Sequence, residues 1–240
     1  MERHFDRVFF DLTGTLLRVR GSVGAVYATA AARHGVHATP ERVDRYFRAA
    51  LATAPPACFP GIAPEAIPAR ERAWWREVVA RAFAPLGHFA AFDDFFAEVF
   101  AIFARPEAWE LLPHAQAALA ALQSEGRKLG VVSEMDARVY AVLEGLGLRN
   151  HFDVVVLSTE CGAVKTDGGL FRVALQRTGD APAHCVHVGD SLAADAGGAR
   201  SAGITAILLG APAAPPGVRI AADLAAIPDC IRALERDLLG

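Results

Sequence analysis

The apolar residues of this chain gather in short runs that lack the alternation of a half-exposed strand. Such runs are typical of strands that are buried on both faces, as in a parallel sheet covered by helices. Five runs have this pattern: Val8 to Phe10, Leu129 to Val132, Val154 to Leu157, Cys185 to Val188 and Ile204 to Leu209. From about residue 110, helical patterns separate the runs, which indicates parallel crossovers. The sequence therefore predicts an α/β fold built on a doubly wound parallel sheet.

A long stretch after the first run has a different pattern. It lacks a comparable strand run, and Thr39-Pro40 has the form of a helix start. Two series of apolar residues follow at helical spacing: Trp75, Val78, Val79, Ala82 and Phe83, and then Phe92, Phe96, Val99, Phe100 and Phe103. We therefore expect a helical insertion over residues 18–108, with the α/β core formed by residues 1–17 and 109–240.

The composition favours a folded enzyme-sized domain and excludes several classes of partner. The 240 residues are 53% hydrophobic and 21% charged, which suffices for one core with a sizeable insertion. A net charge of -3 gives no basic footprint, so we expect no nucleic-acid partner. No signal peptide or membrane-length apolar run is visible, and the four cysteines are scattered, so a cytoplasmic protein without a membrane partner is expected. Both a monomer and a homodimer remain compatible with the aromatic-rich insertion.

Two of the predicted strands end at an aspartate. Asp11 follows the first run, and Asp190 follows Val188-Gly189. Because parallel strands place their carboxyl ends at one edge of the sheet, we expect the two carboxylates to meet there. A carboxylate in this position can attack phosphorus if the repulsion between two anions is relieved. Mg²⁺ suits this task, since hard cations prefer carboxylate oxygens, and Asp11 and Asp190 are its candidate ligands.

Three further residues gain a role only beside these aspartates. Asp195 can accept a metal-bound water or orient Lys165. Ser133, at the end of a predicted strand, and Lys165 can bind phosphoryl oxygens, the first through its hydroxyl and the second through its charge. His187, by contrast, belongs to no metal-ligand spacing and is expected to be structural, like His184.

In order and spacing, these segments resemble the four motifs of the haloacid dehalogenase-like superfamily. The matching segments are Asp11 to Thr15, Val131 to Ser133, Lys165, and Gly189-Asp190 with Asp195. The resemblance implies a Rossmann-like core, a helical cap inserted after the first strand, and a metal site formed by Asp11, Thr13, Asp190 and Asp195. Three segments further resemble the cap of the branch named after a rhythmically expressed gene: Val23 to Tyr27, His34-Gly35 and Trp74 to Val78.

Thr13 departs from the pattern of ordinary phosphatases in this superfamily. Their residue two positions after the nucleophile is a second aspartate, which protonates the leaving alcohol and later activates water. A threonine does neither well at neutral pH. General acid–base catalysis contributes about 10²- to 10⁴-fold, so its loss raises the barrier by roughly 3 to 5 kcal/mol. Thr13 therefore favours an anhydride or acyl phosphate, a long-lived phosphoenzyme, or slow promiscuous hydrolysis.

The expected function is a Mg²⁺-dependent phosphohydrolase that acts through an aspartyl-phosphate on a small phosphorylated metabolite. Asp11, Thr13, Ser133 and Lys165 form the expected catalytic set. Ser133, Lys165, Glu134 and Tyr27 are expected to contact the substrate, although helix packing is the other interpretation of Tyr27. The Glu134 carboxylate would repel a phosphate unless it points away or pairs with a cation such as Arg138.

Two other functions fit the same sequence. In a 2-haloacid dehalogenase, Asp11 attacks carbon without a metal, and Arg18 or Arg20 binds the carboxylate of the substrate. The Asp190 and Asp195 pair argues for a metal instead. A binding or regulatory protein with a phosphate pocket and little turnover is the second alternative, and Thr13 is compatible with it.

Overall fold

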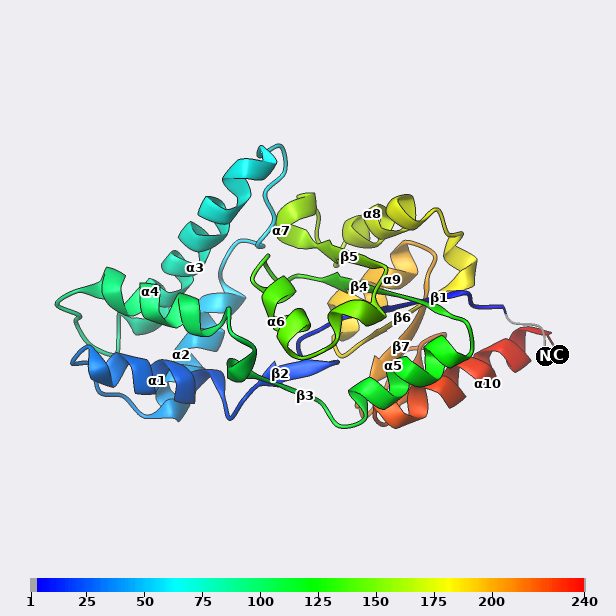
Figure 1. Cartoon of the computed structure of the whole chain (residues 1–240), viewed down its shortest axis with the longest axis horizontal. Helices are drawn as coiled ribbons and strands as arrows, with labels where there is room; N and C mark the ends of the chain where they lie inside the picture. The colour runs from blue at the N-terminus through cyan, green and yellow to red at the C-terminus, as the bar shows by residue number, and fades with distance from the viewer. Residues whose placement is uncertain (1–3, 240) are drawn as a thin grey trace.

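The computed structural model describes residues 4–239 and contains a six-stranded parallel sheet (Figure 1). The strand order is β5-β4-β1-β6-β7-β8. The strands are β1 (Arg7–Phe10), β4 (Lys128–Ser133), β5 (Val154–Leu157), β6 (Cys185–Gly189), β7 (Thr205–Leu209) and β8 (Arg219–Ala221). The first five correspond to the predicted runs, whereas the short edge strand β8 was not predicted.

Helices cover both faces of the sheet, as the run pattern requires. Phe10 faces an apolar core formed with α5 (Ala115–Ser124), α6 (Val139–Gly145) and α10 (Ile227–Leu239). Phe9, its neighbour in β1, points the other way, toward α8 (Gly169–Thr178) and α9 (Gly198–Ser201). Successive strand residues alternate between faces, so one strand contributes to two cores. The doubly wound α/β fold is thus confirmed.

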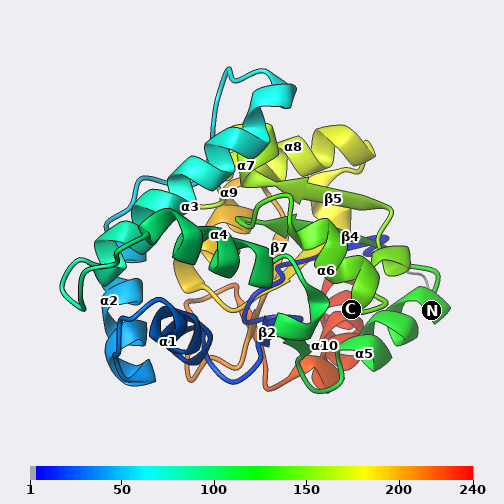
Figure 2. The same ribbon diagram turned by 60° about the vertical axis from the view of Figure 1, so that its left-hand side comes forward.

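Four helices form a separate group beside the sheet, which we call the helical unit (left in Figure 1, turned forward in Figure 2). They are α1 (Val23–Arg33), α2 (Pro40–Ala52), α3 (Ile67–Phe83) and α4 (Phe92–Ile102). The predicted start of α2 is confirmed, because the Thr39 side chain accepts a hydrogen bond from the backbone N–H of Arg42. An antiparallel pair, β2 (Leu17–Val19) and β3 (Trp109–Leu111), connects this unit to the sheet.

The remaining elements are short. A four-residue helix α7 (Ser158–Cys161) follows β5, and a π-helical turn (Leu192–Gly197) follows β6. Single 3₁₀ turns occupy Pro64–Ala66, Pro106–Ala108, Arg149–His151, Pro182–His184 and Leu224–Ala226. In the described part of the chain, no helix has the length and apolar character needed to cross a bilayer.

The pairing register brings three strand ends together. Phe10 of β1 pairs with Val131 of β4 on one side and with Val188 of β6 on the other. The residues just beyond these positions, among them Asp11, therefore emerge at one edge. The backbone N–H of Asp11 also bonds to the Val188 carbonyl at 3.0 Å, which fixes the turn that carries the carboxylate.

Candidate functional site

Three carboxylates converge at the carboxyl edge of the sheet. Asp11, Asp190 and Asp195 each offer an oxygen atom, and these atoms lie within 4.8 Å of one another. Asp11 and Asp195 are buried, whereas Asp190 is exposed. Although Asp190 is exposed by surface area, neighbouring atoms partly shield its carboxyl group from water. This desolvation, followed by the negative charges of Asp11 and Asp195, raises the pKa of Asp190. Hard oxygen donors at this spacing fit a divalent cation such as Mg²⁺, which would offset the repulsion among them.

Two glycines allow these carboxylates to approach the backbone. Gly14 adopts a φ of +88°, and a Cβ atom there would lie 2.4 Å from Oδ2 of Asp190. A Cβ atom at Gly189 would lie 2.1 Å from Cγ of Asp195. Both distances are far below van der Waals contact, so any side chain at either position would displace a carboxylate. The glycines of the two motifs are therefore part of the geometry of the site.

Lys165 lies between two of the carboxylates. Its Nζ is 2.5 Å from Oδ1 of Asp11 and 2.6 Å from Oδ1 of Asp195. Burial acts to lower the pKa of Lys165, but the two negative charges outweigh it and the pKa is raised. The Ser133 hydroxyl also donates to Oδ1 of Asp11, at 3.1 Å. Lys165 is thus a charged ammonium that, with Ser133, holds one oxygen of Asp11.

Asp195 holds Lys165 and is itself held by two other donors. Nε2 of His187 lies 2.8 Å from its Oδ1, and the backbone N–H of Ser191 donates to its Oδ2 at 2.9 Å. Burial would raise the pKa of Asp195, but the His187 hydrogen bond and the Lys165 charge lower it. Both Asp195 oxygens are engaged, so the geometry favours its predicted role as the residue that orients Lys165.

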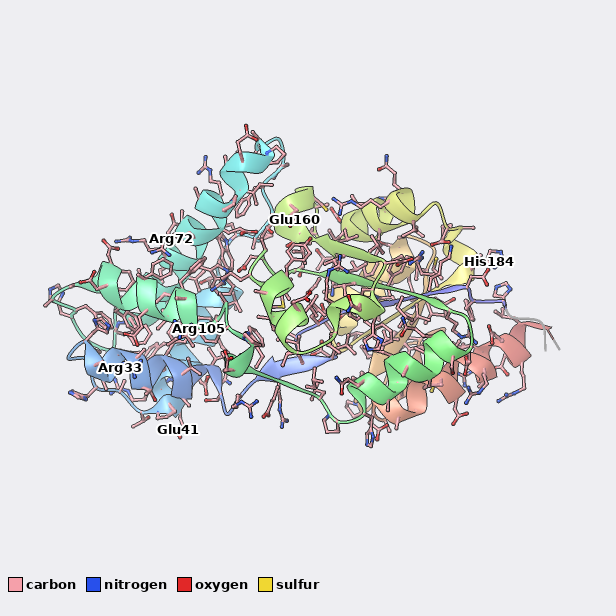
Figure 3. The ribbon with its side chains drawn as sticks, viewed as in Figure 1. Arg33, Glu41, Arg72, Arg105, Glu160 and His184 are labelled. Carbon is pink, nitrogen blue, oxygen red and sulfur yellow. The ribbon has the colours of Figure 1, made fainter. Side chains whose placement is uncertain are left out.

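The sequence did not indicate that His187 contacts the site. It lies fully buried within β6, and burial lowers its pKa, so the ring is neutral. The proton must then be on Nε2, because that nitrogen faces a carboxylate. Its Nδ1 finds no hydrogen-bond partner within residues 4–239. His184 lies at the other end of the sheet, where Nδ1 contacts the His4 carbonyl (Figure 3).

A cavity of about 430 Å³ opens between these groups and the helical unit. Its floor is formed by site residues of the sheet edge, and its walls by aromatic rings of the helical unit. The floor includes Asp11, Thr13, Ser133, Lys165, Asp190 and Asp195, and the walls include Tyr27, Phe47, Trp74, Trp75 and Phe103. The structure therefore brings every residue of the predicted phosphohydrolase site, Glu134 included, to one cavity.

Thr13 and Glu134 take positions that bear on the chemistry. The Thr13 hydroxyl lies 3.2 Å from Sδ of Met135, a weak acceptor. Oε1 of Glu134 accepts the backbone N–H of Lys165 at 3.1 Å, so this carboxylate supports the loop that carries the lysine. Of the two alternatives for Glu134, pairing with Arg138 is not the one that the structure has, because Arg138 makes its ion pair with Asp136, at 2.5 Å.

The arginines considered for a dehalogenase lie elsewhere. Arg18 lies in β2 and Arg20 directly follows that strand. More than half of each side chain is exposed, and both pair with Glu110 of β3. Neither belongs to the lining of the cavity. Arg138 is the arginine that the cavity does contain, and two contacts engage it with Asp136.

Two residues of α3 join the helical unit to the loop after β4. Trp75 donates its indole N–H to Asp136. Glu71 is buried, and its Oε1 accepts from the Thr159 hydroxyl at 2.6 Å and from the backbone N–H of Ala137 at 3.1 Å. Burial raises the pKa of Glu71, although these two hydrogen bonds act to lower it. The charged residues Glu134, Asp136 and Arg138 follow a strand end in the sequence, but no local pattern indicated that α3 would meet them.

Residues 5–203 match the haloacid dehalogenase-like hydrolase family. The haloacid dehalogenase-like hydrolase domain-containing protein 3 of Mus musculus is 36% identical over 203 residues, which cover 83% of this chain and 80% of that protein. The rhythmically expressed gene 2 protein of Drosophila melanogaster is 27% identical over 204 residues, which cover 80% of this chain and 77% of that protein. The resemblance in the motifs thus extends over most of the chain.

Similarity to a phosphatase and to a dehalogenase accompanies these matches. A phosphoserine phosphatase of Thermus thermophilus is 37% identical over 108 residues, or 45% of this chain and 43% of that protein. The structure of L-2-haloacid dehalogenase from Xanthobacter autotrophicus superposes with a TM-score of 0.71 at 20% identity, covering 96% of this chain and 99% of that one. At that identity the superposition establishes the fold alone. With the family match covering most of its length, the chain belongs to the haloacid dehalogenase-like hydrolases.

Proposed function

We propose that this hydrolase is a Mg²⁺-dependent phosphohydrolase that acts on a small phosphorylated molecule through an aspartyl-phosphate at Asp11. One observation carries the proposal: the Asp11 carboxylate opens onto the cavity with Lys165 at 2.5 Å and with Asp190 and Asp195 beside it. An anion bound there meets a buried ammonium as well as a nucleophile. Residues 18–108 would serve as the cap over a core of residues 1–17 and 109–240, in a cytoplasmic enzyme.

The positions of these groups support a covalent step. An Asp11 oxygen forms a bond to phosphorus while the bond from phosphorus to the leaving oxygen breaks, and that oxygen departs with the electron pair. Water then attacks the aspartyl-phosphate, which releases inorganic phosphate and regenerates the Asp11 carboxylate. Lys165 and Ser133 exchange their contacts with Asp11 for contacts with phosphoryl oxygens as negative charge develops.

The acidic cluster supplies the ligands for the cation. Asp11, Asp190 and the backbone oxygen of Thr13 would hold it, while Asp195 keeps Lys165 in place from the side. When bound, Mg²⁺ lowers the repulsion between the phosphoryl group and the carboxylates. The Thr13 side chain supplies no acid for the leaving group, so the proposed substrates have leaving oxygens that depart with little protonation.

Phosphate release from a panel of esters and acyl phosphates, with Mg²⁺ and with a chelator, tests the proposal. Wild-type protein should release phosphate only with the metal, and Asp11→Asn should abolish release while leaving the thermal unfolding curve intact. Halide release from 2-haloacids without metal would instead establish a dehalogenase, against which the remote positions of Arg18 and Arg20 argue. Ligand binding without any turnover would identify a binding protein.

A further inference from the structure

We infer that the cavity accepts phosphate compounds whose leaving group is aromatic and carries no charge beyond the departing oxygen, namely aryl phosphates and mixed anhydrides of aromatic carboxylic acids. The inference rests on the proposed function and names the substrate class of the same site. Three features carry it: the rings that form the wall, the pairing of every cation in the lining, and the one hydroxyl of the wall that makes no hydrogen bond.

The wall presents ring faces. Trp74 donates its indole N–H to the Pro55 carbonyl, and Trp75 donates its own to Asp136. Both indole N–H groups are therefore already hydrogen-bonded within the protein, so a ligand can contact only the apolar surface of these rings. The Phe47 and Trp75 rings lie 6.3 Å apart between centroids and within 8° of parallel, so they offer aligned faces to a flat group.

The charges of the lining disfavour a second anionic group on the substrate. Five lining residues are carboxylates, whereas the cations are Lys165 and Arg138. Lys165 is bound by Asp11 and Asp195. Arg138 is bound by Asp136 through two contacts, of 2.8 and 2.5 Å, and its guanidinium lies 4.0 Å from the centroid of the Phe100 ring. A carboxylate or a second phosphate would thus meet like charges without a free cation to pair with.

Tyr27 supplies a single polar group on the apolar wall. It lines the cavity from α1, and within residues 4–239 its hydroxyl makes no hydrogen bond. Burial raises the pKa of this phenol, so it remains neutral and can donate. One donor among rings suits an ester or carbonyl oxygen next to an aromatic ring, whereas a sugar would leave several hydroxyls unpaired. Aryl oxides and carboxylates are also the leaving groups that Thr13, lacking an acid, permits.

A matched pair of esters tests the charge argument. Phenyl phosphate and 4-carboxyphenyl phosphate differ by one remote carboxylate and have leaving groups of similar basicity. We expect kcat/KM for the carboxylated ester to be lower by about 10-fold or more. We also expect 1-naphthyl phosphate to exceed phenyl phosphate, and O-phosphoserine and glucose 6-phosphate to be the poorest substrates. A preference for the carboxylated ester or for the sugar phosphate would overturn the inference, while Mg²⁺-dependent release abolished in Asp11→Asn would leave the proposed function standing.

Two variants test the ring argument. Phe47→Ala should reduce the preference for naphthyl over methyl phosphate by about 3- to 10-fold, because a ring contact is lost. Phe89→Ala removes a buried ring of the helical unit that does not line the cavity and should leave this ratio unchanged. Equal ratios in both variants would refute the assignment of the wall. Calorimetric binding of the two phenyl esters to Asp11→Asn measures the charge preference without turnover, so this result stands even if the proposed function fails.

Discussion

Replacing His187 by asparagine or by glutamine separates the hydrogen bond of this residue from its bulk. The terminal nitrogen of glutamine can occupy the place of Nε2, whereas that of asparagine reaches only the place of Nδ1. Nε2 is the atom that contacts Asp195, at 2.8 Å, and Nδ1 makes no hydrogen bond within the described residues. Glutamine therefore preserves the donor to Asp195 and asparagine removes it. Both substitutions remove the imidazole ring that packs against Phe171.

The size of the effect follows from what Asp195 loses. A hydrogen bond to a charged group contributes about 1.5 to 3 kcal/mol. If Asp195 then turns toward another donor, Lys165 is no longer held at 2.6 Å by its second carboxylate. If the whole free energy of this hydrogen bond is added to the activation free energy of the reaction, kcat falls by roughly 10- to 150-fold, because each 1.36 kcal/mol corresponds to a factor of ten. The same loss in stability lowers Tm by about 2 to 4 °C for each kcal/mol in a chain of this size.

The assay is steady-state phosphate release at saturating Mg²⁺, together with thermal unfolding of each variant. We expect His187→Asn to lower kcat by about 10-fold or more and His187→Gln to stay within roughly threefold of wild type. The Tm of His187→Asn should also lie about 3 to 12 °C below that of His187→Gln, because only asparagine loses the hydrogen bond to Asp195. Equal kcat for both variants would show that the ring serves packing alone. If Tm decreases in His187→Asn while kcat is unchanged, the position of Lys165 does not depend on the hydrogen bond between His187 and Asp195, and the argument is refuted.

Three further changes test other parts of the molecule. Asp190→Ala should weaken Mg²⁺ binding and activity together by about 10-fold or more, measured by metal titration, because a carboxylate ligand is lost. Thr13→Asp should accelerate alkyl phosphates more than p-nitrophenyl phosphate; an equal gain for both would exclude acid catalysis as its cause. Glu235→Gln removes the buried carboxylate that binds two nitrogens of Arg127 and leaves Glu125 as its remaining anion, so it should destabilise the fold by about 3 kcal/mol, the low end for a broken buried pair, at pH 7. Because Arg127 and backbone donors lower the Glu235 pKa despite burial, the difference from wild type should vanish in denaturation curves as the pH falls below the ordinary glutamate range.

The sheet and its reactive edge could be predicted because both depend on local patterns. Apolar runs without alternation identify buried strands, and parallel strands place residues such as Asp11 and Asp190 at one edge. The strand β8 escaped prediction since Arg219–Ala221 is three residues long, begins with a charge and follows a proline-rich segment. At that length, a strand depends on its neighbour β7 for its pairing.

Contacts between distant side chains account for what the sequence did not reveal. Glu134 turns to the backbone of Lys165, 31 residues away, and Arg138 to the nearer Asp136. The first contact joins loops that follow different strands, which no local pattern encodes. The second involves α3 only through Trp75, which donates to the same Asp136 carboxylate. His187 was expected to be structural because it belongs to no metal-ligand spacing, and its contact with Asp195 arises only when the π-helical turn folds back over β6.

The buried carboxyl group of Glu71 makes the packing of the helical unit against the core depend on pH. Any motion that parts α3 from Thr159 and Ala137 exposes this group to water and returns its raised pKa to the ordinary range. A proton bound in the packed form is then released in the parted form, so by linkage a rise in pH favours parting and a fall favours packing. The effect is confined to the interval between the two pKa values. Within that interval, a proton acts as a ligand that holds the two halves of the molecule together.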